Sequence, residues 1–220
     1  MRPRPPAAGP DGIARLPRAG PGDTAGAAGR VHSADPGSDI LVGMTAPRQL
    51  IVIRHAKAAS PESAEADHER PLTPRGVADA KAMGAWLKER GISVDLVLCS
   101  TATRTRETWA GIVEGGKLGA LVEHDPRIYN ASVERLIGVI REQGKSARSV
   151  ALVGHAPGIP GLAATLSEGR GDEDEKLAMA SGFPTCTAGV LEVEAPWKEL
   201  AAGTAELVAV HTARSDDASD

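Results

Sequence analysis

The sequence predicts an α/β fold in which helices cover both faces of a mostly parallel central sheet. Short β-branched apolar runs alternate with segments that carry apolar residues at helical spacing, from residue 49 to residue 211. Glycine, proline and capping residues mark the boundaries between these segments. Because this alternation is typical of parallel strands joined by helices, we expect a three-layer α/β/α sandwich.

The expected strands are short and apolar. The first, QLIVI, covers residues 49–53 and has the composition of a buried strand. Others of the same character follow after each expected helix, and two strands close the chain. They cover residues 94–99, 121–124, 149–153, 187–192 and 206–211.

The first expected helix begins after Thr73, which suits the N-cap, with Pro74 at the first helical position. Gly91 follows the last apolar residue and suits the end of the helix. Gly84 lies inside the helix, where glycine costs about 1 kcal/mol relative to alanine. Further helices are expected over residues 103–113, 132–142 and 159–166.

The chain divides by composition into three parts. Residues 1–43 hold seven prolines and eight glycines and show no apolar period, so we expect residues 1–45 to be a disordered Gly/Pro/Ala-rich extension. That extension lacks the apolar core of a secretory signal, and a translation start at Met44 is an alternative. Residues 46–213 are expected to form one domain, and residues 214–220 a disordered tail.

Composition also excludes several classes of function. The net charge is −4 and aromatic residues are only 2% of the chain, which argues against a nucleic-acid partner. No apolar run approaches the roughly 18 residues of a membrane span, so we expect no membrane partner and a cytoplasmic location. Two cysteines cannot form a disulfide framework.

Arginine and histidine follow three of the expected strands. Arg54 and His55 come directly after the first strand, Arg104 follows the second, and His155 follows the strand over residues 149–153. Ligands of α/β sheets bind outside the carboxyl ends of the strands. We therefore expect these four side chains to meet at one edge of the sheet.

Two guanidinium groups and two imidazoles suit a dianionic tetrahedral group such as a phosphoryl group. No cluster of metal ligands accompanies them in the sequence, and the acidic run over residues 172–175 lacks the spacing of a calcium loop. We expect that run to be a solvated loop, and we expect neither a metal nor a cofactor. A histidine can also act as a nucleophile and form a covalent intermediate.

The motifs that contain these residues resemble those of the histidine phosphatase superfamily, also called phosphoglycerate mutase-like. They are LIVIRHAK at residues 50–57, CSTATRTRET at 99–108 and LVGHAPGI at 152–159. Two further segments, DHERPLTPRG at 67–76 and DPRIYNAS at 125–132, resemble the SixA-type phosphohistidine phosphatases. The resemblance implies a phosphoglycerate mutase-like fold for the whole domain.

The resemblance also implies roles for the strand-end residues. His55 matches the nucleophile that becomes phosphorylated, and Arg54 and Arg104 match the arginines that hold the phosphoryl oxygens. His155 matches the histidine that donates a further hydrogen bond to the transferring group. The implied function is a metal-independent phosphatase that acts on phosphohistidine in a protein.

Three further residues are weaker candidates. Asp67 matches the segment that can supply a general acid, and Arg70 in the same segment is a candidate phosphate contact. Lys57 lies two residues after His55 and is a candidate substrate contact, although an ordinary surface lysine fits equally well.

The sequence departs from the family pattern next to the reactive residues. Ala56, Thr101 and Ala156 replace the usual glycine, proline and asparagine. Two alternatives therefore stay open. The first is a phosphatase of a small phosphomonoester, because the shared chemistry does not fix the leaving group. The second is a phosphoryl-binding module without turnover, which the three replaced residues suggest.

Overall fold

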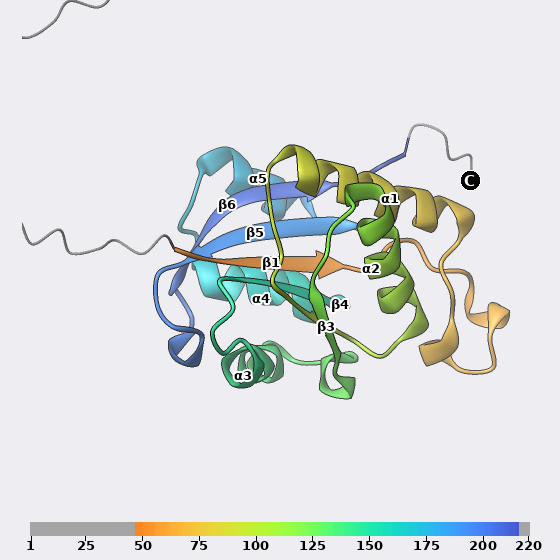
Figure 1. The fold of residues 1–220 in the computed structure, drawn as a ribbon, viewed down its shortest axis with the longest axis horizontal. Coiled ribbons are helices and arrows are strands. Elements are labelled where there is room, and N and C mark those ends of the chain that lie inside the picture. The colour runs from red at the N-terminus through yellow and green to blue at the C-terminus, as the bar shows by residue number, and fades with distance from the viewer. Residues whose placement is uncertain (1–46, 216–220) are drawn as a thin grey trace, which may run out of the picture. The chain divides into compact units, whose positions relative to one another are not determined.

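The computed structural model describes residues 47–215, which form six strands and five α-helices (Figure 1). All the expected strands and helices are present, with ends that differ by a few residues. The strands are β1 (Arg48–Arg54), β2 (Leu96–Cys99), β3 (Leu121–His124), β4 (Ser149–Gly154), β5 (Thr187–Val193) and β6 (Ala205–Thr212). The helices are α1 (Pro74–Glu89), α2 (Thr103–Gly116), α3 (Val133–Gln143), α4 (Gly158–Ser167) and α5 (Glu173–Ser181).

The strands form one sheet in the order β3-β2-β4-β1-β5-β6. The pairs β2–β3, β2–β4 and β1–β4 are parallel, and β5 is antiparallel to both of its neighbours. The expected mostly parallel sheet is therefore confirmed. Since β1, β2 and β4 are adjacent and parallel, their carboxyl ends lie at the same edge.

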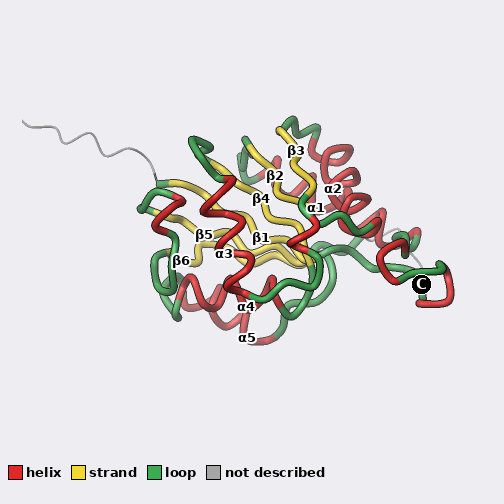
Figure 2. Tube along the Cα trace, turned by 90° about the horizontal axis from the view of Figure 1, so that it is seen from below, coloured by secondary structure: helices red, strands yellow, loops and turns green. Residues whose placement is uncertain are grey.

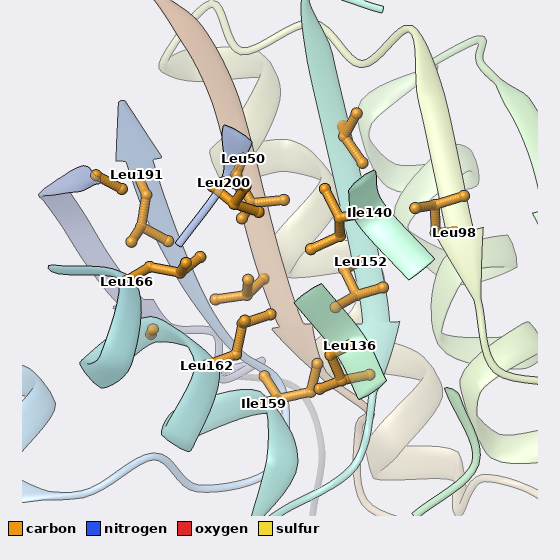
Figure 3. Close-up of a cluster of buried hydrophobic side chains, with 14 of the residues drawn as sticks. Leu50, Leu98, Leu136, Ile140, Leu152, Ile159, Leu162, Leu166, Leu191 and Leu200 are labelled. Atoms are coloured by element: carbon orange, nitrogen blue, oxygen red, sulfur yellow. The ribbon is translucent and has the colours of Figure 1, made fainter. Parts of the chain in front are cut away.

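Alternate side chains of each strand enter separate hydrophobic cores on the two faces of the sheet. On β1, Leu50 and Val52 pack into a core with α3 and α4, whereas Ile51 and Ile53 pack into a core with α1 and α2. Figure 2 shows the helices on both sides of the sheet, and Figure 3 shows side chains of α3 close to Leu152 of β4. The expected α/β/α sandwich is therefore confirmed.

Small residues allow α1 and α2 to pack closely. A Cβ atom placed on Gly84 of α1 would lie 2.1 Å from the carbonyl oxygen of Ile112 in α2. The glycine that weakens the helix by propensity is therefore required by the contact between the helices. Thr73 caps α1 as expected, because its Oγ1 accepts a hydrogen bond from the backbone N–H of Gly76 at 3.0 Å.

The acidic run was expected to be a solvated loop, and here the structure differs. Asp172 is the N-cap of α5, and the three acidic residues after it form the first turn of that helix. Negative side chains are favoured at this end because the N-terminal N–H groups carry partial positive charge. The run is therefore the start of a helix and not a loop.

The expectations for the chain ends fall mostly on residues outside those described. The extension over residues 1–45 and residues 216–220 of the tail lie there. Arg214 and Ser215 are described, and both make hydrogen bonds to the domain. No helix between residues 47 and 215 is long and apolar enough to cross a membrane.

Candidate active site

The carboxyl ends of β1 and β4 place two histidines side by side. Arg54 pairs with Gly154 in the parallel register, and the backbone N–H of His55 donates to the carbonyl of Gly154 at 3.1 Å. The ring centroids of His55 and His155 are consequently 5.2 Å apart. The two histidines that the sequence placed on separate strands therefore face one site.

A backbone hydrogen bond fixes the tautomer of His55. Its Nδ1 lies 2.8 Å from the carbonyl oxygen of Ala56. A carbonyl oxygen can only accept, so Nδ1 carries the proton and donates it. The lone pair of the neutral ring is therefore on Nε2, which is the atom available to attack phosphorus.

The surroundings of His55 also keep its ring neutral. Burial lowers the pKa of His55 to about 4; the hydrogen bond to Ala56 opposes this shift, and the positive charges of Arg104 and Arg54 add to it. An imidazole with such a pKa is unprotonated at neutral pH. His55 thus has the protonation state that nucleophilic catalysis needs.

His155 is buried and paired on one nitrogen only. Its Nε2 lies 2.9 Å from Oγ of Ser100, which follows β2, and its Nδ1 is buried with no hydrogen-bond partner among the described residues. Burial, followed by the charges of His55 and Arg104, lowers the pKa of His155 to about 3. An unpaired buried nitrogen is costly, and a bound phosphoryl oxygen would supply a partner if Nδ1 carries the proton.

Arg54 is held by the loop before β5. Its Nη1 donates to the carbonyl oxygen of Phe183 at 2.8 Å, and its Nε is buried without a hydrogen-bond partner within the described part of the chain. Like His155, Arg54 therefore has a buried polar nitrogen that an anion can satisfy.

Arg104 lies in the first turn of α2, and its side chain is only 6% exposed. Thr108, one helical turn later, connects this turn to the first motif. Its Oγ1 donates to the carbonyl of Arg104 at 2.6 Å and accepts from the backbone N–H of Ala56 at 2.9 Å. The second and first motifs are thus joined directly, which explains why a threonine suits this position.

Asp67 accepts hydrogen bonds from three other side chains of the site. Its Oδ2 accepts from Nη2 of Arg104 at 2.9 Å and from the hydroxyl of Tyr129 at 2.6 Å, and its Oδ1 accepts from Nη1 of Arg70 at 2.8 Å. The Tyr129 bond, followed by the Arg70 bond, holds the pKa of Asp67 well below its usual range. Asp67 is therefore ionised at neutral pH in this arrangement and has no proton to donate.

The other two weak candidates occupy the border of this cluster. Besides Asp67, Arg70 contacts the carbonyl of Ala59, to which its Nε and Nη2 donate at 3.0 and 2.6 Å, so it closes the loop that carries Asp67. Lys57 is exposed, and its carbonyl accepts from the N–H of Thr73 at the start of α1.

The structure adds two residues to the site that the sequence motifs did not single out. The ring of Tyr129 meets the ring of His155 edge-on at 5.2 Å, and the guanidinium of Arg104 lies over the tyrosine ring. The ring of His68 meets that of Tyr129 edge-on with 5.1 Å between the centroids, and Nε2 of His68 lies 2.9 Å from Oγ1 of Thr101. Tyr129 lies within the DPRIYNAS segment, so that segment is the signal that could have found it.

Between residues 47 and 215, no three His, Cys, Asp or Glu side chains are grouped as a metal site requires. The polar cluster consists mainly of cations around two neutral imidazoles. Such an arrangement can bind a phosphoryl group and accept it on a ring nitrogen.

Comparison with known proteins agrees with this chemistry. The model of the histidine phosphatase superfamily (branch 1) matches residues 50–153. An uncharacterised protein of Mycobacterium tuberculosis is 37% identical over 163 residues, which are 74% of this chain and 100% of the relative. The phosphohistidine phosphatase SixA of Escherichia coli is 27% identical over 55% of this chain and 75% of the relative.

Solved structures show the same fold. The putative phosphohistidine phosphatase SixA of Nakamurella multipartitia is 34% identical, with a TM-score of 0.68 over 77% of this chain and 98% of that one. A protein histidine phosphatase SixA complexed with tungstate has a TM-score of 0.61 at 22% identity, over 74% of this chain and 96% of that one. The chain therefore belongs to the histidine phosphatase superfamily and is a phosphatase.

Proposed function

We propose that this phosphatase removes the phosphoryl group from phosphohistidine in a protein, through a covalent intermediate on Nε2 of His55. The names of the SixA relatives support this substrate class. The observation that carries the proposal is that Asp67, the one candidate for a general acid from the sequence, has both carboxylate oxygens engaged by donors, Oδ2 by Arg104 and Tyr129 and Oδ1 by Arg70. A site without a protonated acid favours a substrate whose leaving group needs none.

Phosphohistidine and phosphomonoesters differ in this respect. When the bond from phosphorus to the bridging oxygen of a phosphomonoester breaks, the alcohol leaves as an alkoxide unless an acid protonates that oxygen. Phosphohistidine carries a second ring nitrogen that solvent can protonate, since imidazole has a pKa of about 6.5. The ring then leaves as neutral imidazole with no proton from the enzyme, so phosphohistidine fits the groups present.

In the first step the lone pair on Nε2 of His55 forms a bond to phosphorus. The bond from phosphorus to the substrate nitrogen breaks, and its electron pair stays on the leaving imidazole. The positive charge that develops on the His55 ring is shared with Nδ1–H, which already donates to the carbonyl of Ala56. That carbonyl therefore stabilises the phosphorylated ring.

The arginines and the second histidine stabilise the transferring group. Arg54 and Arg104 carry fixed positive charge beside His55, and phosphoryl transfer depends on positioning and charge more than on covalent chemistry. His155 offers its unpaired Nδ1. Asp67 and Arg70 hold Arg104 and the loop around it, and Lys57 is left as a substrate contact at the surface.

In the second step water attacks phosphorus on the opposite side. The bond to Nε2 of His55 breaks, its electron pair returns to the ring, and the proton of the water leaves to phosphate or to solvent. The products are inorganic phosphate and the free enzyme, with His55 again neutral.

A substrate panel tests the proposal. The enzyme is given a phosphohistidine-containing phosphotransfer protein, a phosphoglycerate and a sugar phosphate, and release of inorganic phosphate is measured with His55→Asn as the inactive control. We expect kcat/KM to be at least about 100-fold higher for phosphohistidine. Higher kcat/KM for either phosphomonoester would overturn the substrate class, and equal binding with no turnover would identify a phosphoryl-binding module.

A further inference from the structure

We propose that Asp79 and Arg214 are positioning residues for the phosphoryl transfer, although neither lies in a sequence motif of the site. Asp79 is in α1, 24 positions after His55, and Arg214 follows β6, 159 positions after His55. The inference rests on the proposed function, because it assigns these two residues the role of holding Arg54 and His55 in place.

Asp79 anchors the end of the described chain. Its side chain is only 2% exposed, yet it is a carboxylate. Its Oδ1 accepts from the backbone N–H of Ser215 at 2.9 Å, and its Oδ2 lies 3.8 Å from Nη1 of Arg214 and 3.9 Å from Nε of Arg75. A buried carboxylate is stable only when such partners surround it. The positions of Arg214 and Ser215 and the burial of Asp79 therefore depend on each other.

Residues 213–215, which Asp79 anchors, in turn hold the loop before β5. Nη1 of Arg214 donates to the carbonyl of Thr185 at 2.9 Å, and the N–H of Ala213 donates to the carbonyl of Cys186 at 3.0 Å. Cys186 has a φ of 57°, a conformation that residues other than glycine rarely adopt. Such a conformation persists where the surrounding contacts fix it, and these two bonds supply contacts on either side.

The same loop contacts both reactive residues. The N–H of Cys186 donates to the carbonyl of His55 at 3.0 Å, and the carbonyl of Phe183 accepts from Nη1 of Arg54 at 2.8 Å. A continuous series of hydrogen bonds and close charge contacts therefore leads from Asp79 through Arg214 and the loop to the nucleophile and to a phosphate-binding arginine. Figure 1 shows the chain beyond β6 running toward α1.

Small displacements of this loop would matter for the reaction. The effectiveness of an oriented nucleophile falls steeply when the reacting atoms are misplaced by about 1 Å. Asp79 and Arg214 would act on the rate of phosphorylation and on oxyanion binding, through the positions of His55 and Arg54. Substitution of a residue that only stabilises the fold would change neither the phosphorylation rate nor the oxyanion affinity of the molecules that remain folded.

The test compares Asp79→Asn and Arg214→Ala with a matched control in the full-length protein. Arg141→Ala is the control, because Arg141 on α3 also donates to a loop carbonyl, that of Leu200 at 2.7 Å, on the other face of the sheet. Single-turnover phosphorylation of His55 is measured with phosphoramidate as the donor, and the Kd of orthovanadate is measured by titration. Circular dichroism gives the folded fraction of each variant.

We expect each of the two variants to phosphorylate His55 about tenfold more slowly and to bind vanadate more weakly, with Arg141→Ala like the wild type in both. We also expect the double variant to be no worse than the more affected single variant, because the two residues act as one unit. Rates and Kd values equal to those of Arg141→Ala would overturn the inference. So would multiplicative effects in the double variant.

The two measurements separate this inference from the proposed function. If the wild type is not phosphorylated on His55, the proposed mechanism fails, while the vanadate Kd still tests the positioning of Arg54. If the wild type is phosphorylated and the variants match it, the positioning role alone fails. The side chain of Arg214 is 38% exposed, against 2% for Asp79, so Arg214→Ala keeps the test available if Asp79→Asn does not fold.

Discussion

Asp67 and Arg104 form an ion pair, with 2.9 Å between Oδ2 and Nη2, in which the arginine is buried and the carboxylate is half exposed. The carbonyl of Asp67 also accepts from Nη1 of the same guanidinium at 2.6 Å. Arg104, which we propose binds phosphate, is thus directed by a residue of the loop between β1 and α1. A bound phosphoryl group would compete with the carboxylate for this guanidinium, so we expect the pair to affect the affinity of the site for an oxyanion.

Asp67→Asn tests whether the carboxylate is an acid or a holder of Arg104. Because Asp67 is ionised in this arrangement, we expect the variant to turn over phosphohistidine within about tenfold of the wild-type rate. Steady-state kinetics with the phosphotransfer protein measures the turnover rate. Tyr129→Phe, which removes one hydrogen bond to the same carboxylate, is the companion variant. Loss of a general acid typically slows turnover by about 10²–10⁴, and a decrease within that range would contradict the role of a residue that only holds Arg104.

Removal of Arg104 should have a far larger effect. Arg104→Ala is expected to lower kcat/KM about 100- to 1,000-fold, as loss of one donor to a developing oxyanion does. Arg106→Ala is the matched control, since Arg106 is exposed on the same helix and bonds within its own turn, to Thr103 at 3.4 Å. Equal losses for the two variants would refute the assignment of Arg104.

The pKa of His55 predicts an unusual titration. In an NMR titration of phosphate-free protein, the ring resonances of His55, assigned by comparison with His55→Gln, should shift with a midpoint near pH 4. Between about pH 6.5 and pH 4 the unfolded chain binds a proton that folded His55 does not, so the free energy of unfolding should fall as the pH is lowered through this window. A midpoint near the ordinary value of about 6.5 would show that burial does not control this ring.

Replacing glycine by alanine should have opposite effects on stability in two of the helices. Gly84→Ala should destabilise the protein by about 1–3 kcal/mol, because the new Cβ would meet the carbonyl of Ile112 at 2.1 Å. Gly138→Ala in α3 should stabilise it by about 0.5–1 kcal/mol, because nothing lies within 4 Å of the new Cβ. Urea unfolding measures both, and a stabilising Gly84→Ala would show that the helix contact is looser than described.

The sheet and the meeting of His55 with His155 followed from the sequence because both depend on local patterns. Apolar runs set the strands, and parallel neighbours must end at one edge. Thr73 was likewise predictable as a cap, since its bond to Gly76 is made within one turn.

Contacts between distant segments could not be predicted in this way. The bonds of Asp67 to Tyr129 and of Arg54 to Phe183 join residues 62 and 129 positions apart, and no periodicity encodes such distances. The start of α5 escaped prediction for another reason. Its acidic residues have a composition that suits a solvated loop as well as a favourable first turn of a helix.

The residue that carries the phosphoryl group decides whether the proposed mechanism is right. The wild type is mixed with a phosphohistidine-containing phosphotransfer protein labelled with ³²P, quenched in alkali within milliseconds, and digested for mass spectrometry. We predict an acid-labile phosphoryl group on the peptide that contains His55, formed and lost at rates consistent with turnover, and absent in His55→Asn. Turnover that persists in His55→Asn, or a label on another residue, would show that His55 is not the nucleophile.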